Sequence, residues 1–284
     1  MMMIHTLLWV FYFISAMILL YYNNRIIEKQ EAYMAYFIYQ KQKIYYQEIG
    51  TGTPLLMLHG NTASSVMFSD IASKYSKDYR VILIDFLGYG KSDRVTELAE
   101  DLWYDEGMQV ICFLKEKKYR NVKLIGTSGG ALAALNVSLE RPDLVSHLIA
   151  DSFEGEQANP DITEALRQGR KASKDDYGAR MFYKMMNGID WERVVDADTR
   201  AVIAHANHIR NFFHKSLYEL KPKVLFTGSK EDPLFPCGFY EALFKNMLHK
   251  IEHGQQYLFE SGGHPAMLSN QEEFIEISKN FLNK

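Results

Sequence analysis

The feature that most constrains this chain is a series of short apolar runs that alternate with longer segments. The runs lie at residues 55–58, 81–85, 122–126, 145–150, 223–228 and 257–260. Most are separated by segments of helical period, such as Asp101 to Lys118. Apolar strands that alternate with helices are typical of a parallel sheet covered on both faces. The sequence therefore predicts the α/β class, with a mostly parallel sheet between two layers of helices.

Two segments ahead of these runs have a different pattern. "YMAYFIYQ" and "KIYYQEIG" alternate in polarity, are rich in aromatic and β-branched residues, and are separated by a polar turn. We expect them to form an antiparallel pair at one edge of the sheet.

The alternation of strands and helices is interrupted once, between residues 152 and 221. This stretch is rich in charge and contains three helix-like patches. An uninterrupted loop of this length is improbable in a compact domain. We therefore expect a helical insertion at 152–221 within a core formed by residues 34–151 and 222–284.

The N-terminus is unusually apolar. Fifteen of the sixteen residues from Leu7 to Tyr22 are apolar, and the run approaches twenty residues if the preceding positions are admitted. A cleaved signal peptide, which would need a basic start and a small-residue cleavage site, and a packed helix are the alternatives. Basic residues such as Arg25 and Lys29 follow the run and none precedes it, which places the bulk of the chain on the cytoplasmic side. We expect a transmembrane anchor at 1–24, a single-pass membrane location and a cytoplasmic catalytic domain.

Composition excludes several other classes. The 32 Lys and Arg residues nearly balance the 35 Asp and Glu residues, so no surface for nucleic acid is expected. Cys112 and Cys237 are isolated and should be reduced and structural. "GYGKS" is similar to a phosphate-binding loop, but that motif requires glycine at the position of Asp85.

A candidate nucleophile lies in "LIGTSGGALAAL". Ser128 occupies the centre of G-x-S-x-G, between a segment typical of a strand and one typical of a helix. In that context the motif forms a sharp turn that exposes a serine above the edge of the sheet. A structural glycine-rich turn is the alternative.

A serine nucleophile needs a base, and the base needs an orienting acid. His264 lies in a glycine-flanked loop after the last apolar run and is the predicted base, although a surface histidine is possible. Asp232, in the loop after the preceding run, is the predicted acid. Glu231 and Asp151 are its rivals.

The chain order Ser128, Asp232, His264 is that of the α/β-hydrolases. The sequence resembles this family in three further segments: "LLMLHGNTAS", "ILIDFLGYGKSD" and the stretch that follows the nucleophile. The resemblance covers about residues 34–150 and 222–284, and it implies the α/β-hydrolase fold with a variable helical cap at the insertion. It also implies an oxyanion hole formed by the backbone amides of Asn61 and Gly129. His59 is expected to be structural, whereas the Asn61 side chain could add a polar contact.

No metal or cofactor is expected. The histidines of the insertion lack carboxylates at a known ligand spacing. The aromatic and methionine cluster of the insertion is expected to pack in its core rather than to line a substrate site. These two groups are His205, His208 and His214, and Met181, Phe182, Tyr183, Met185 and Met186.

Together these features predict a serine hydrolase that cleaves a carboxylic ester or related small acyl substrate through an acyl-enzyme, and the expected membrane anchor favours a lipophilic substrate. C–C bond hydrolysis, thioesterase, amidase and perhydrolase activities use the same triad and stay open. Serine at the nucleophile position disfavours relatives that use aspartate there. A noncatalytic binding protein of the same fold is the alternative from another class. The substrate and the oligomeric state are left open.

Overall fold

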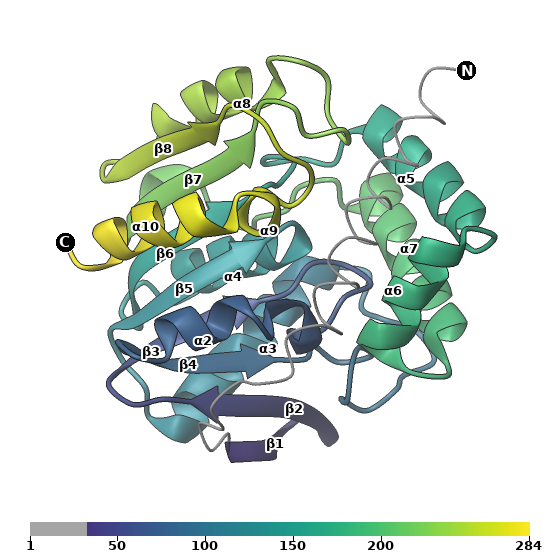
Figure 1. Ribbon diagram of the computed structural model, residues 1–284, viewed down its shortest axis with the longest axis horizontal. Helices are drawn as coiled ribbons and strands as arrows, with labels where there is room; N and C mark the ends of the chain where they lie inside the picture. The colour runs from purple at the N-terminus through teal and green to yellow at the C-terminus, as the bar shows by residue number, and fades with distance from the viewer. Residues whose placement is uncertain (1–32) are drawn as a thin grey trace.

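The computed structural model describes residues 33–284, which form an eight-stranded sheet flanked by helices (Figure 1). The strand order is β1-β2-β4-β3-β5-β6-β7-β8. Only β1 and β2 run antiparallel to their neighbours; the other pairs are parallel. The strands are β1 (Tyr33–Tyr39), β2 (Gln42–Ile49), β3 (Thr53–Leu58), β4 (Tyr79–Ile84), β5 (Val122–Thr127), β6 (Val145–Asp151), β7 (Lys223–Ser229) and β8 (Gly254–Phe259). The predicted fold class and the antiparallel edge pair are confirmed.

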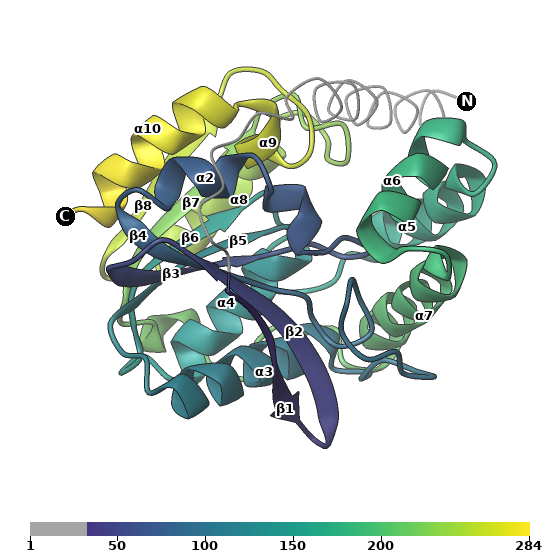
Figure 2. The ribbon, with the colours of Figure 1, turned by 60° about the horizontal axis from the view of Figure 1, so that its bottom comes forward.

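The helices cover both faces of this sheet (Figure 2). One face packs against α3 (Leu102–Lys117), α4 (Gly129–Glu140) and α8 (Phe239–Leu248). The other packs against η1 (Ser65–Phe68), α2 (Ile71–Tyr75), α9 (Ala266–Ser269) and α10 (Gln271–Leu282). A short η2 (Leu217–Glu219) precedes β7.

The apolar runs of the sequence follow from this double cover. Successive residues of a strand point to opposite faces, so Leu56 and Leu58 of β3 join one core while Leu55 and Met57 join the other. All four side chains are fully buried. A strand in this position must be apolar at every residue, which is why the runs do not alternate.

Three further helices lie beside the carboxyl ends of the parallel strands. They are α5 (Pro160–Ser173), α6 (Tyr177–Asn187) and α7 (Trp191–His208), and they pack on one another. Asn159 and Asp176 cap the first two, because their side chains accept from amides of the first turn. These helices place residues of the predicted insertion across the end of the sheet where β5, β6 and β7 stop.

The predicted single-pass membrane location requires correction. Among residues 33–284, no helix is both long enough and apolar enough to cross a bilayer. The segment 1–24, on which the prediction of an anchor depended, lies outside the described residues.

Candidate active site

Ser128 sits at the junction of β5 and α4 with a strained backbone. Its φ of 54° and ψ of −125° lie in a region that residues with a side chain rarely adopt. The turn is possible because its flanking residues are glycines. A Cβ on Gly126 would lie 2.2 Å from the carbonyl oxygen of Gly130, and a Cβ on Gly130 would lie 2.1 Å from that of Leu58. Such a turn holds the serine at the carboxyl end of β5, facing away from the sheet.

His264 and Asp232 come from neighbouring loops at the same end of the sheet. Asp232 follows β7 and His264 follows β8, and Nδ1 of the histidine lies 2.8 Å from Oδ2 of the aspartate. The aspartate is buried. It also accepts from the Tyr240 hydroxyl at 2.9 Å and from the backbone N–H of Leu234 at 3.0 Å. These donors fix the carboxylate that contacts the imidazole.

The structure pairs His264 with Asp232 rather than with either rival acid. Asp151, at the end of β6, is fully buried and accepts from the hydroxyls of Thr127 and Thr227 and from the backbone N–H of Met267. Burial raises the pKa of Asp151 to about 6, against the effect of these hydrogen bonds. Asp151 therefore ties β5, β6 and β7 to the segment after His264.

The surroundings of His264 favour its protonated form. Burial by itself lowers the pKa of this imidazole, but the charge of Asp232, the hydrogen bond to it and the charge of Asp151 together raise the pKa above its ordinary value. A basic imidazole that lines the same cavity as a serine is suited to accept the proton of the serine hydroxyl.

The loop after β3 lies directly against Ser128. A Cβ on Gly60 would come within 2.9 Å of the serine Cβ and 3.4 Å of its Oγ, so only glycine fits there without displacing a neighbour. The position of a Cβ on Gly129 would be 2.2 Å from Oδ1 of Asn61. The two residues predicted to form the oxyanion hole are thus neighbours beside the serine.

The Asn61 side chain is engaged within the protein. Its Nδ2 donates to Oδ2 of Asp198 at 2.9 Å, and its Oδ1 accepts from Nε1 of Trp103 at 3.2 Å. Both polar atoms of this side chain therefore have partners within the protein, and Asn61 also lines the cavity described below.

His59 also forms hydrogen bonds within the protein. Its Nε2 accepts from the backbone N–H of Phe86, and its Nδ1 lies 2.8 Å from the carbonyl oxygen of Gly60.

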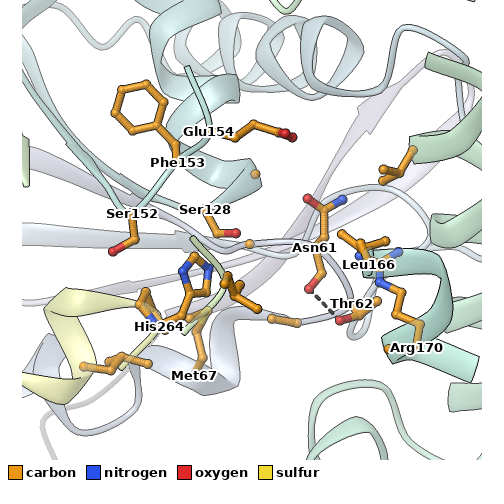
Figure 3. A pocket seen from close by; sticks show the side chains of 18 of the residues that line it. Asn61, Thr62, Met67, Ser128, Ser152, Phe153, Glu154, Leu166, Arg170 and His264 are labelled. Atoms are coloured by element: carbon orange, nitrogen blue, oxygen red, sulfur yellow. Dashed lines mark hydrogen bonds between the residues drawn. The ribbon is translucent and has the colours of Figure 1, made fainter. Parts of the chain in front are cut away.

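The candidate catalytic residues line a cavity of about 320 Å³ (Figure 3). Ser128, His264, Asn61 and Gly129 all line it. Most of the remaining wall is apolar, and α5 and α6 supply part of it. The apolar lining includes Met67, Leu132, Phe153, Ile162, Leu166, Phe182, Met185, Met186, Val202, Leu234 and Phe235. Phe182, Tyr183, Met185 and Met186 line the cavity, and Tyr183 also packs in a buried cluster of the insertion with Trp191 and Val195.

Three charged residues at or behind the cavity were not predicted from the sequence. Glu154 and Arg170 line the cavity, and Asp198 lies behind it, where it accepts from Arg170. Glu154 follows the end of β6 by three residues, the position where an α/β sheet presents its functional groups. Asp198 lies on the same helix face as Val194 and Val202. A carboxylate on an otherwise apolar helix face indicates a buried polar contact, and this pattern is present in the sequence.

The histidines of the insertion have carboxylate neighbours that the sequence did not suggest. His214 lies 2.5 Å from Asp101, and His208 contacts Glu100. His205 is buried, 3.7 Å from Asp101. Within residues 33–284 these groups do not converge on a point that could hold a metal ion.

Comparison with known proteins identifies the fold. A family model for the alpha/beta hydrolase fold matches residues 53–185. An esterase from Exiguobacterium antarcticum matches with a TM-score of 0.69 and 24% identity, over 86% of this chain and 96% of its own. The chain has the α/β-hydrolase fold.

The names of relatives of this chain refer to different reactions. A proline iminopeptidase from Clostridium botulinum is 27% identical over 89% of this chain and 98% of its own length. The 2-hydroxy-6-oxo-6-(2'-aminophenyl)hexa-2,4-dienoic acid hydrolase of Metapseudomonas resinovorans is 26% identical over 84% of this chain and 87% of its own length. The prediction of a hydrolase enzyme is confirmed, and the names of the relatives leave its substrate open.

Proposed function

We propose that this α/β-hydrolase is a serine hydrolase that cleaves a carboxylic ester or related acyl substrate. The observation that carries the proposal is the 2.8 Å contact between His264 and Asp232, beside a cavity that His264 shares with Ser128. The strained backbone of Ser128 supports it, because strain of this kind is retained where function requires it.

The mechanism follows from the roles that these groups can fill. His264 takes the proton of the Ser128 hydroxyl as its Oγ attacks the acyl carbonyl, and Asp232 stabilises the imidazolium. The backbone amides of Asn61 and Gly129 donate to the developing oxyanion. His264 then protonates the leaving group. In the second half of the reaction it activates the water that releases the acyl group from Ser128.

Two features shape the substrate side of this proposal. The cavity is mainly apolar, which favours an apolar acyl or alcohol group. Residues 152–221 act as the cap that selects it, and residues 34–151 and 222–284 form the catalytic core. The same triad supports C–C bond or amide hydrolysis, and the relatives named above make these the second candidates.

A fluorophosphonate probe tests the proposal. The wild-type protein should be labelled at Ser128 and should hydrolyse short nitrophenyl esters, whereas Ser128→Ala should do neither. Equal labelling of the two proteins, or none of the wild type, contradicts the proposal. A panel of matched esters, amides and C–C substrates then ranks the candidate reactions by kcat/KM.

A further inference from the structure

Glu154 brings a carboxyl group with one unpartnered oxygen into a largely apolar cavity. It lies in the segment between β6 and α5, on the same cavity wall as Ser152 and Phe153 (Figure 3). Its Oε2 atom is buried, and within residues 33–284 no hydrogen-bond partner reaches it. A buried polar atom without a partner costs free energy, so a native protein retains one where a ligand or a function supplies the missing contact.

Among residues 33–284, no ion pair to a basic side chain is found for this carboxyl group, and no charged side chain is among the influences on its pKa. Burial raises the pKa of Glu154 to about 7, and the opposing influence is a hydrogen bond from the backbone N–H of Asn159. Arg170, the cationic side chain in the same cavity lining, is paired with Asp198. In the part of the chain that the structure describes, the carboxyl group of Glu154 therefore lines the cavity without a cationic partner.

We propose that Glu154 binds a protonated amine of the substrate, so that the hydrolase acts on acyl compounds that combine an apolar body with an ammonium group. The proposal rests on the proposed function, because it assumes that the substrate occupies the cavity beside Ser128. An ammonium group donates up to three hydrogen bonds. It also carries a positive charge, which can pair with the negative charge of the carboxylate. In a cavity of low polarity such a pair discriminates strongly against a substrate without the donor.

The test uses methyl esters of straight-chain acids that end in an ammonium, a hydroxyl or a methyl group, at four to eight carbons. A second series carries the same three groups on the alcohol part of a hexanoate ester. Hydrolysis is followed by titration of the released acid for the wild type and two variants, Glu154→Gln and Glu156→Gln. Glu156 is the matched control, because it lies two residues away and pairs with Lys250.

In at least one series the wild type should prefer the ammonium ester to the methyl ester by about tenfold or more in kcat/KM. Glu154→Gln should abolish this preference, measured as the ratio of kcat/KM for the ammonium ester to kcat/KM for the methyl ester, since the preference depends on the charge of the carboxylate. Glu156→Gln should keep the preference.

Three outcomes would overturn the proposal. The first is equal hydrolysis of all three esters by the wild type in both series, and the second is a preference for the hydroxyl ester over the ammonium ester. The third is an ammonium preference that survives in Glu154→Gln. In all three cases the proposed hydrolase function stands, because the wild type still cleaves esters. Absence of hydrolysis together with absence of fluorophosphonate labelling contradicts the hydrolase function, and the amine proposal with it.

Discussion

Asp198 of α7 accepts a hydrogen bond from the side-chain amide of Asn61 at 2.9 Å. The same oxygen accepts from the backbone N–H of Thr62 at 3.2 Å and from the Tyr89 hydroxyl at 2.6 Å. Its other oxygen accepts from Arg170. One carboxylate of the insertion thus holds the loop that carries a proposed oxyanion donor, and we regard Asp198 as a positioning residue.

Replacement of this carboxylate should reduce turnover more than binding. In Asp198→Asn, an NH₂ group replaces one of the two oxygens and faces a hydrogen-bond donor. Either Arg170 or the loop that contains Asn61 and Thr62 therefore loses its acceptor. Because the loop presents the Asn61 amide, we expect kcat for a nitrophenyl ester to fall by about 10- to 100-fold while KM changes by less than about threefold. Asp196→Asn is the control on the same helix, since Asp196 is half exposed and pairs with Lys174. Equal losses in the two variants, or a loss confined to KM, would contradict a positioning role.

The assignment of the acid can be tested with two isosteric variants. Asp232→Asn removes the charge that contacts His264, and we expect kcat to fall by about 10⁴-fold. Asp151→Asn should retain activity within about fivefold, because the new amide can donate to the hydroxyl oxygen of Thr227, and hydroxyls both donate and accept. The measurement is kcat on a nitrophenyl ester, with circular dichroism as the check of folding. If Asp151→Asn proves the more damaging of the two, the acid is Asp151.

The acid limb of the pH profile should report His264. The base must be neutral to accept a proton, so activity is lost as pH falls through the pKa of the imidazole. Because its surroundings raise that pKa, half-maximal kcat/KM should occur above about pH 6.5, the ordinary value for histidine. In Asp232→Asn, burial becomes the main influence on the pKa of His264 and lowers it. The midpoint of the acid limb of kcat/KM should therefore move to lower pH. A midpoint below 6 in the wild type, or one that does not move in the variant, would rule out this assignment.

The strain at Ser128 should appear as a difference in stability between two inactive variants. Glycine tolerates a φ of 54° whereas alanine does not, so Ser128→Gly should be more stable than Ser128→Ala by about 1 kcal/mol. For a chain of this size that difference corresponds to about 2–4 °C in Tm.

Ser138, in the interior of α4, provides the control for this comparison. There the order should reverse, since glycine weakens a helix by about 1 kcal/mol relative to alanine. The same order of glycine and alanine at both positions would mean that the backbone of Ser128 is not strained. Thermal unfolding of the four variants is the measurement.

Local pattern was enough to predict the sheet, the nucleophile turn and the histidine loop. Apolar runs mark strands buried on two faces, and their carboxyl ends must meet at one edge of a parallel sheet. Ser128, Asp232 and His264 follow such ends, so their convergence could be read from the order of the chain. The same reasoning left Glu231 and Asp151 as rivals, because it locates a loop without giving the direction of a side chain.

The tertiary structure alone decided the contacts between the insertion and the core. The partner of Asp198 lies 137 positions away at Asn61, and no periodicity along the chain relates the two. Among the described residues, the lack of a hydrogen-bond partner for Oε2 of Glu154 likewise depends on which groups reach it once α5, α6 and α7 have packed. The sequence by itself thus determined the fold and the residues that could perform the chemistry, because both depend on local order. Which acid holds His264 and what lines the cavity depended on packing between distant segments.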